Sequence, residues 1–538
     1  MVGKVNDAIY GKTSQCVQWE YASTLPYQDP FNEIELDIHI TSADGERWVI
    51  PSFWMGQERW GVRFMTDKAG IYHIKTYCTD TSNASLHHVA HTLVIKQENT
   101  PVSQCLQLSS DKRYLEDTYK HPFLWLADTW WMGLCDRLSY RDFQHLTQYR
   151  KTQGFNVIML VAGLFPDMDS FDSRGENVSG FPWEYNYTAI NPAYFDEADK
   201  RIEYLLENGL IPTILGSWGY YLQHLGEKKM KQHWRYIIAR WGAYPVVWCI
   251  AGEATMPYYL SQSRTQDMYA LHEGWTRLAT YIKSIEPFGN LITIHPTEIG
   301  RDQLQDPSML DFNLIQAGHE GYKSVNNACK LIAQERHKEP LMPLVVGEMN
   351  YEGILQNTHP SMQRLCFWTA LLSGAKGYSY GANGVWQINT HENPFGASPH
   401  GENWGDVPWR ESYLYEGAMH LGYAKKLLAA YPWWLFEPHP EWISPQRDMM
   451  HYKSPKVAGI PEKVRMIYFY THDYRWWHRP KFSIEKLESH ILYHAFFWNP
   501  RDAKRYPLGD VIINKKGAWR VPKLPTKEDW VLILETKS

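Results

Sequence analysis

Several patterns that mark common protein classes are absent from this sequence. The seven cysteines are widely spaced and include no C-x-x-C pair, so neither a disulfide framework nor a zinc ribbon is indicated. No stretch approaches the about 18 to 20 apolar residues that a membrane span requires. No block of Lys and Arg occurs, and 54 basic against 59 acidic residues leave a net charge of −5. Because nucleic-acid proteins rely on phosphate contacts, we expect neither nucleic acid nor membrane as a partner.

Motifs of several cofactor and metal enzymes are also missing. There is no H-E-x-x-H, no P-loop and no G-x-G-x-x-G followed by an acidic residue, so we predict no cofactor and no catalytic metal. One G-x-S-x-G occurs at residues 377–381, but a nucleophile elbow needs a helix directly after Ser379, and a loop is expected there. Residues 1–15 lack the apolar segment of a secretory signal, which predicts a cytoplasmic protein. A signal removed from the chain would make it secreted or periplasmic.

Aromatic residues, by contrast, are abundant. They make up 15% of the chain, with 25 Trp and 35 Tyr. Many are expected in the core, including the neighbouring pairs Trp433 and Trp434, and Trp476 and Trp477. Clustered Trp and Tyr also suit carbohydrate, because the apolar face of a sugar ring packs on an aromatic face while its edge offers polar atoms. An oligosaccharide, a polysaccharide or another glycoside is therefore an open substrate class.

The pattern of apolar residues divides the chain into three domains. Residues 1–104 contain short alternating strands, which predict a small β-sandwich. Residues 105–430 alternate short apolar runs with amphipathic helices, as is typical of βα units around a parallel sheet. Residues 431–538 return to strands and predict a second β-sandwich. Eight apolar runs in the middle part predict a (β/α)₈ barrel: 123–127, 155–161, 211–215, 246–251, 291–294, 312–316, 344–347 and 375–380.

Two glutamates stand where the active site of such a barrel is expected, at the C-terminal ends of the strands. Glu253 follows the fourth predicted strand and Glu348 the seventh, each directly after a glycine. Glycoside hydrolysis needs two carboxyl groups, since one protonates the leaving oxygen while the other attacks or directs water. Either Glu alone is as readily explained by a salt bridge at a loop start. Jointly they predict a catalytic pair.

Further polar and aromatic residues follow the other predicted strands. Asp128 ends the first strand before Trp130 and Trp131, and is predicted to bind sugar hydroxyls while the indoles wall the subsite. The alternative is that Asp128 caps the next helix and both Trp residues lie in the core. We expect about half of the remaining strand-end residues to contact substrate: Trp218, His295, Gln316, His319, Tyr380, Asn383 and Trp386.

A likeness to a known family is carried by four segments of the barrel, residues 113–130, 154–158, 247–253 and 346–348. They resemble the apiosidase-like barrel hydrolases, relatives of a large retaining clan that includes cellulases and β-galactosidases. Residues 60–72 resemble the β-sandwich that often precedes this barrel. Residues 496–501 resemble a sandwich named for collagen binding that often follows it, although a packed cap on the barrel explains the apolar strands there more simply.

This resemblance implies roles for the two glutamates. Glu253 would be the acid/base and Glu348 the nucleophile, with net retention of anomeric configuration. The clan commonly has Asn directly before the acid/base, where its amide helps to hold the sugar 2-hydroxyl, but this chain has Gly252. Another side chain must then bind that hydroxyl, which leaves the sugar open.

We thus predict a retaining, exo-acting glycoside hydrolase that cleaves a terminal sugar, either a furanoside such as apiose, arabinofuranose or galactofuranose, or a pyranoside. Burial and the neighbouring carboxylate should keep Glu253 protonated near neutral pH. The two carboxyl groups should lie about 5 to 5.5 Å apart. A noncatalytic carbohydrate-binding protein on the same scaffold is the alternative. Such a binding protein would be marked by the loss of one carboxylate, and both carboxylates are present here. The sequence predicts no oligomeric state.

Overall fold

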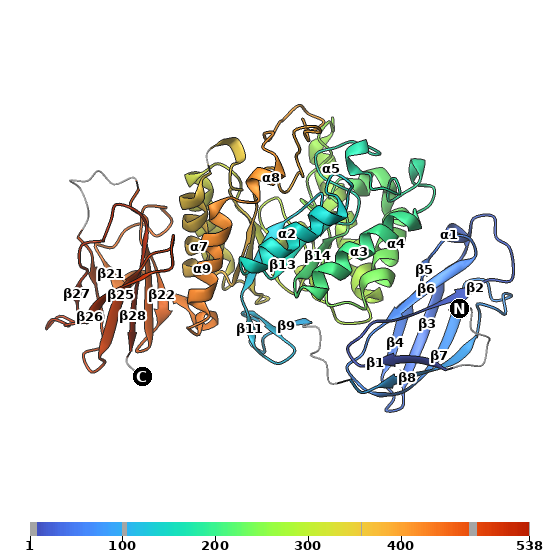
Figure 1. Ribbon diagram of the computed structural model, residues 1–538, viewed down its shortest axis with the longest axis horizontal. Helices are drawn as coiled ribbons and strands as arrows, with labels where there is room; N and C mark the ends of the chain where they lie inside the picture. Colours follow the sequence, from blue (N-terminus) through green and yellow to red (C-terminus); the bar gives the residue numbers. More distant parts are fainter. Residues whose placement is uncertain (1–7, 99–104, 357, 473–480, 537–538) are drawn as a thin grey trace.

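The computed structural model describes residues 8–98, 105–356, 358–472 and 481–536. Three bodies lie in a row along the long axis (Figure 1): an N-terminal β body, a central α/β body and a C-terminal β body. The helices that the structure describes include none that is long and apolar enough to cross a membrane. Of the expected core pairs, Trp433 is buried and Trp434 packs partly buried against the main core, whereas Trp476 and Trp477 lie outside the described residues.

The central body is built on an eight-stranded parallel sheet that nearly closes into a barrel, as the eight apolar runs predict. Its end strands are tied together, since the N–H of Asp311 donates to the carbonyl of Ile292 (2.8 Å) and the Thr293 hydroxyl donates to the carbonyl of Phe312 (2.9 Å). The strands are β12 (Trp125–Thr129), β13 (Val157–Val161), β14 (Ile211–Leu215), β15 (Val247–Cys249), β16 (Ile292–Thr293), β17 (Asn313–Gln316), β18 (Leu344–Glu348) and β19 (Gly377–Tyr380).

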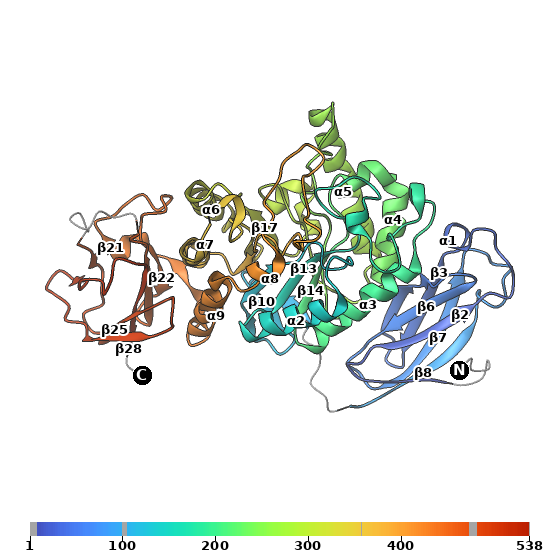
Figure 2. The ribbon, with the colours of Figure 1, turned by 45° about the horizontal axis from the view of Figure 1, so that its top comes forward.

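Helices surround the barrel (Figure 2). They are α2 (Tyr140–Thr152), α3 (Pro192–Glu207), α4 (Tyr221–Trp241), α5 (Arg264–Ile285), α6 (Tyr322–Glu335), α7 (Pro360–Ser373), α8 (Trp409–Ser412) and α9 (Glu416–Leu428). Helix α3 illustrates how local sequence sets an element: the Asn191 side chain accepts from the N–H of Ala193, and Pro192 occupies the first turn, where its missing N–H costs nothing. Its buried residues then face the sheet at helical spacing: Phe195, Ala198, Ile202 and Leu205.

The N-terminal body consists of two antiparallel-rich sheets around one apolar core, as expected of a sandwich. The strands of the larger sheet lie in the order β1 (Ile9–Lys12), β8 (Ala90–Lys96), β7 (Gly70–Cys78), β3 (Leu36–Ser42) and β4 (Arg47–Pro51). Those of the smaller sheet lie in the order β2 (Val17–Ala22), β6 (Arg59–Phe64) and β5 (Phe53–Trp54). The short helix α1 spans Pro30–Glu33. This body docks on the barrel through Arg63, whose Nη2 lies 2.5 Å from Asp199 Oδ2 on α3. Arg240 on α4 binds the same carboxylate, so a buried charge is fully paired.

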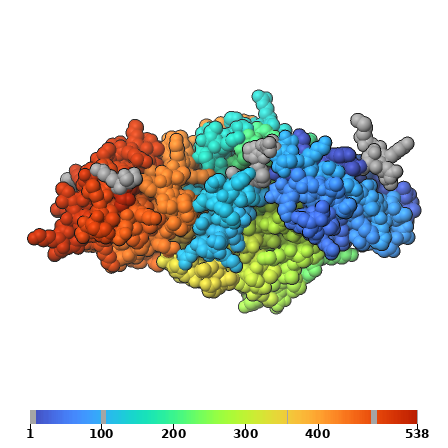
Figure 3. Space-filling view, turned by 90° about the horizontal axis from the view of Figure 1, so that it is seen from below, coloured from blue at the N-terminus to red at the C-terminus, as the bar shows by residue number. Residues whose placement is uncertain are grey.

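A small sheet joins the N-terminal body to the barrel. It contains β9 (Leu106–Leu108), β10 (Leu115–Asp117) and β11 (Pro122–Phe123). Because β11 runs directly into β12, this sheet lies at the N-terminal end of the barrel strands, and seen from below it covers that face (Figure 3, light blue). The site predicted at the opposite, C-terminal ends is therefore left open by it.

The C-terminal body also has two sheets around an apolar core. The six-stranded sheet has the order β20 (Glu437–Pro438), β22 (Lys456–Ile460), β23 (Val464–Phe469), β28 (Trp530–Thr536), β25 (Tyr493–Trp498), β26 (Arg505–Asp510), and the smaller has β21 (Ile443–Ser444), β24 (Ser483–Ile484), β27 (Trp519–Arg520). Together with the barrel and the N-terminal sandwich, this arrangement confirms the predicted fold class.

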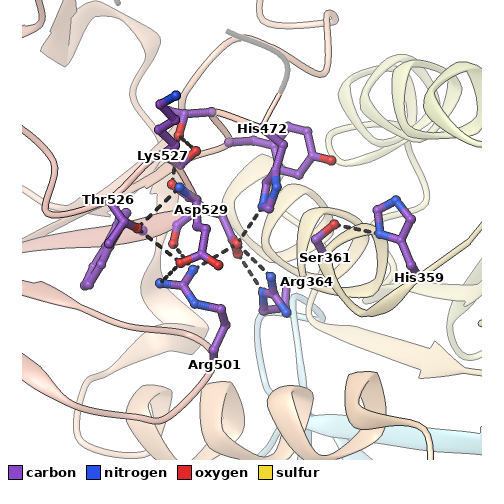
Figure 4. A network of polar contacts seen from close by, with 12 residues as sticks. His359, Ser361, Arg364, His472, Arg501, Thr526, Lys527 and Asp529 are labelled. Carbon is purple, nitrogen blue, oxygen red and sulfur yellow. Dashed lines mark hydrogen bonds and ion pairs between the residues drawn. The ribbon is translucent and has the colours of Figure 1, made fainter. Parts of the chain in front are cut away.

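A polar network holds the C-terminal body to α7 of the barrel (Figure 4). Asp529 accepts two hydrogen bonds of 2.7 Å from the guanidinium of Arg364, and is also bonded by Arg501 (3.2 Å), His472 (3.1 Å) and Tyr468 (3.0 Å). Burial by itself would raise the pKa of Asp529, but hydrogen bonds from Arg364 and His472 outweigh it and hold the pKa well below its usual range. The network is therefore an ion pair that stays charged at all ordinary pH values.

Candidate active site

The two predicted catalytic glutamates, Glu253 and Glu348, lie at the mouth of the barrel and line one pocket of about 310 Å³. Glu348 is the last residue of β18, and Glu253 follows β15 by four positions. The amide nitrogen of Gln316, at the end of β17, lies 3.1 Å from Oε1 of Glu253 and 3.1 Å from Oε1 of Glu348. Because both oxygens contact one nitrogen, they lie no farther apart than twice that distance. The barrel thus brings together two carboxyl groups that are 95 positions apart in the chain.

Besides Gln316, three polar groups contact Glu348. Its Oε1 lies 2.8 Å from His319 Nε2, its Oε2 lies 3.1 Å from His295 Nε2, and Tyr351 donates its hydroxyl to Oε2 (2.7 Å). The backbone N–H of Tyr351 donates to Nδ1 of His319, which places the proton of a neutral imidazole on Nε2, facing Glu348. Burial opposes ionisation, but the contacts with His295 and His319 outweigh it and hold the pKa of Glu348 well below its usual range. Glu348 is therefore a carboxylate.

Glu253 has a contrasting environment. The indole N–H of Trp218 donates to its Oε2 (3.2 Å), and Gln316 supplies the second bond. Burial, followed by the charge of Glu348, raises the pKa of Glu253 to about 7. Near neutral pH a large share of Glu253 is protonated beside an ionised Glu348, so one group can give a proton while the other carries negative charge.

Gly252 is glycine because Trp218 occupies the space beside it. A Cβ built on Gly252 would lie 2.2 Å from Cε3 of the Trp218 ring, closer than carbon atoms approach. Two backbone bonds fix this contact, since Gly252 donates to the carbonyl of Ser217 (2.9 Å) and accepts from Gly219 (2.7 Å). They also hold Glu253 in the left-handed region, with φ of 44°. An Asn at position 252 has no room, so Trp218 takes the place of that side chain.

The structure brings five of the ten other predicted residues to the lining of this pocket. Trp131, Trp218, Gln316, His319 and Trp386 line it. His295 is fully buried beside Glu348, and its ring contacts the indoles of Trp131 and Trp218, which also contact each other. It is not among the residues that line the pocket.

Four predicted residues lie elsewhere. Asp128 is buried and paired with Arg150 on α2 (2.6 Å), and Trp130 donates to the same carboxylate (2.8 Å). Successive side chains of a strand point to opposite faces, and the position of Asp128 turns it outward to the helices rather than to the barrel mouth. Tyr380 donates to buried Glu352 (2.7 Å) on this outer layer. Asn383 donates to the carbonyl of Trp404 (2.7 Å) and supports a pocket wall from behind.

Comparison with known families decides what kind of protein holds this pair. Residues 109–435, more than half of the chain, match the family described as "Apiosidase-like, catalytic domain". The chain belongs to the apiosidase-like family. It is a glycoside hydrolase. Residues 13–79 match a second family, described as "Domain of unknown function (DUF5060)". No curated protein matches the chain.

Solved structures share the fold at low sequence identity. One, named "Glycoside hydrolase", is 20% identical with a TM-score of 0.64, and the alignment covers 80% of this chain and 97% of that one. A glycoside hydrolase family 5 protein from Bacteroides vulgatus ATCC 8482 is 22% identical with a TM-score of 0.65, covering 80% and 92%. A further structure from the same organism is 14% identical with a TM-score of 0.68 and covers 98% and 100%. The last one extends over all three bodies of the apiosidase-like chain.

Several lining residues of this apiosidase-like hydrolase carry no signal in the sequence. Asp167 lies in the loop after β13, Tyr259 in the loop after β15, and His400 and Trp404 in the loop after β19. Residues 381–408 of this last loop cross the top of the barrel (Figure 2), where the rings of His400 and Tyr259 stack with centroids 5.0 Å apart. These positions stand several residues beyond the strand ends, where no periodic pattern shows where a side chain points.

Proposed function

We propose that this enzyme is a retaining, exo-acting glycoside hydrolase in which Glu348 is the nucleophile and Glu253 the acid/base. The observation that carries the proposal is the contrast between two carboxyl groups bound to one Gln316 nitrogen, one held ionised and the other with its pKa raised to about 7. Enzymes that need both a nucleophile and an acid separate the pKa values of paired carboxyl groups in this way.

The reaction follows in two steps. In the first, a Glu348 oxygen bonds to the anomeric carbon while the bond to the leaving oxygen breaks and Glu253 transfers its proton to that oxygen. In the second, Glu253 takes a proton from water, the water oxygen bonds to the anomeric carbon, and Glu348 leaves as a carboxylate. Because esterified Glu348 carries no charge, the repulsion that raises the pKa of Glu253 falls after the first step, which favours its action as a base.

The spacing of the carboxyl groups supports retention. Inverting enzymes leave about 6.5 to 9.5 Å between the groups so that a water fits, whereas retaining enzymes have about 5 to 5.5 Å. Here the nearest oxygens lie no farther apart than twice 3.1 Å, because Gln316 bonds both. This upper limit lies below the separation of the carboxyl groups in inverting enzymes.

The pocket supports cleavage at a chain end. Its volume of about 310 Å³ is at the small end of ligand sites, and the loop of residues 381–408 forms one wall. We propose a terminal furanoside, such as apiose, arabinofuranose or galactofuranose, as the sugar, with pyranosides as the competing class. Three indoles at the mouth provide apolar faces for a sugar ring: Trp131, Trp218 and Trp386.

The test is hydrolysis of a panel of aryl furanosides and pyranosides by the wild type and by Glu348→Ala. We expect turnover of at least one member, loss of turnover in the variant, and rescue by sodium azide as a glycosyl azide of configuration opposite to the substrate. Wild-type enzyme with azide is the control, and it should give only the free sugar. Binding of a panel member without cleavage by the wild type, or a rescue product of retained configuration, would contradict the assignment.

A further inference from the structure

The pocket contains a third carboxyl group, Asp167, that the two-step reaction does not use. Its side chain is buried, with 8% of the residue exposed, and it lines the pocket together with Glu253 and Glu348. Within the described residues no Lys, Arg or His lies within ion-pair distance of this carboxylate, whereas most other deeply buried acids of the chain are paired with Arg or His. A buried carboxylate without a cation needs hydrogen-bond donors from another source.

The backbone around Asp167 fixes this side chain in place. Its N–H donates to the hydroxyl of Tyr259 (3.0 Å), and its carbonyl accepts from Nη2 of Arg174 (3.2 Å). These contacts hold Asp167 in the left-handed region, with φ of 56°, an uncommon conformation that persists only where the surroundings enforce it. Arg174 also donates to the carbonyl of Phe395 (2.8 Å), so the same residue ties Asp167 to the loop that walls the pocket.

We propose that Asp167 is a specificity-determining residue that binds hydroxyl groups of the terminal sugar, and that the pocket thereby selects neutral sugars over uronic acids. This inference rests on the proposed function, since it concerns the sugar held at the same site. Selection follows because Asp167 and ionised Glu348 repel a substrate carboxylate, whereas a neutral hydroxyl donates to either. Arg264, the Arg that lines the pocket, is exposed at its rim.

Burial is consistent with this role. It raises the pKa of Asp167 to about 6, while hydrogen bonding with Trp404 and Tyr259 acts in the opposite direction. Hydroxyl donors from a sugar add to these hydrogen bonds and stabilise the buried carboxylate.

The kinetic test uses Asp167→Asn, which keeps the shape of the side chain, with the panel glycoside hydrolysed fastest and its monodeoxy derivatives. We expect kcat/KM to fall about 100-fold or more, because a hydrogen bond to a charged group is lost at a buried site. One monodeoxy derivative should be hydrolysed poorly but equally by the wild type and the variant, since the hydroxyl and Asp167 act on each other. Asp169→Asn is the control, because Asp169 is exposed and outside the pocket, and it should stay within about threefold of the wild type.

A binding test separates this inference from the catalytic proposal. Titration calorimetry of the wild type with apiose, L-arabinose, D-galactose, D-glucose, D-galacturonate and D-glucuronate requires no turnover. We expect a neutral sugar to bind tightest and Asp167→Asn to weaken it at least about tenfold. A uronate that binds tightest, an Asp167→Asn variant that behaves as Asp169→Asn does, or the failure of every sugar to bind would overturn the role of Asp167. Failure of glycoside turnover alone would instead count against the hydrolysis proposal.

Discussion

At the scale of the residue, the chemistry depends on how differently the protein treats two identical side chains. Glu348 accepts from a phenol and contacts two imidazoles, while Glu253 receives one indole N–H and one shared amide N–H. Each further donor stabilises the charged form, and burial destabilises it. The contacts of Glu348 with His295 and His319, and the charge of Glu348 beside buried Glu253, therefore decide which glutamate is ionised.

The pKa of Glu253 predicts the alkaline limb of the pH profile. Glu253 must be protonated in the free enzyme, so kcat/KM for a glycoside with a poor leaving group should fall tenfold per pH unit above about pH 7. Glu253→Gln should lower kcat on that substrate by about 10²- to 10⁴-fold and remove the limb. The leaving group of a 2,4-dinitrophenyl glycoside needs no proton. With this substrate, Glu253→Gln should lower the rate of the glycosylation step far less.

Glu352 provides the control for this profile. Burial also raises its pKa to about 7, but it lies outside the pocket, bonded to Tyr380 and to the N–H of Gly417. Glu352→Gln removes this titrating group without changing the pocket lining, so the alkaline limb should remain. If the alkaline limb persisted in Glu253→Gln and disappeared in Glu352→Gln, Glu253 would not be the acid.

At the scale of the element, the ends of neighbouring strands position the acid. The segment after β14 carries Trp218, the segment after β15 carries Gly252 and Glu253, and a bridge pairs Trp218 with Gly252. The ring of Trp218 thus fills the gap left by the missing side chain and at the same time donates to Glu253. The Trp218 side chain therefore both packs against Gly252 and positions the acid.

Gly252→Ala should damage both stability and catalysis. The added Cβ would meet the Trp218 ring at 2.2 Å, so the ring must move away from Glu253. We expect a loss of about 1–3 kcal/mol in the free energy of unfolding, the usual cost of overpacking, and a lower kcat. Denaturant unfolding and steady-state kinetics measure the two effects.

The double variant Gly252→Ala with Trp218→Ala tests the cause. Removing the ring makes room for the methyl group. The double variant should therefore lose less stability than the sum of the losses in the two single variants. Additive losses, or a Gly252→Ala enzyme with wild-type stability and kcat, would show that the ring and the glycine do not constrain each other.

At the scale of the whole molecule, buried ion pairs hold the flanking bodies on the barrel. Arg364 is 4% exposed and Asp529 is fully buried, and they join α7 to the C-terminal body with two parallel bonds (Figure 4). On the other side, Arg63 joins the N-terminal sandwich to Asp199. Both contacts lie outside the pocket lining, so they matter for assembly rather than for chemistry.

Arg364→Ala should therefore destabilise the protein strongly. It leaves Asp529 buried with weaker partners, and breaking a buried pair costs about 3–5 kcal/mol. Arg364→Lys should not restore stability, because an ammonium cannot make the two parallel bonds. Thermal unfolding measures the loss, and the folded variant should keep its kcat at low temperature.

The surface pair Arg410 and Asp142 is the matched control. The side chain of Arg410 is 63% exposed, and exposed pairs contribute about 0–1 kcal/mol. Arg410→Ala should therefore leave the unfolding transition nearly unchanged. Equal effects of Arg364→Ala and Arg410→Ala would mean that the Asp529 network does not hold the C-terminal body.

The sequence by itself determined the barrel and the place of the catalytic candidates. Eight apolar runs separated by amphipathic helices are typical of a (β/α)₈ barrel, which brings all strand ends to a single mouth, so Glu253 and Glu348 could be predicted to meet. Both signals are local: a strand is visible in a few consecutive residues, and its end is visible in the residue that follows.

Only the tertiary structure decided which neighbours share that mouth. Asp128 stands at a strand end as Glu348 does, yet it faces Arg150 on α2, because the direction of a strand side chain depends on the register of the closed barrel. Asp167, Tyr259 and Trp404 enter the pocket from loops whose conformation is set by contacts between segments far apart in the chain. The two pKa values are likewise tertiary, since burial and donors from four different strand ends set them.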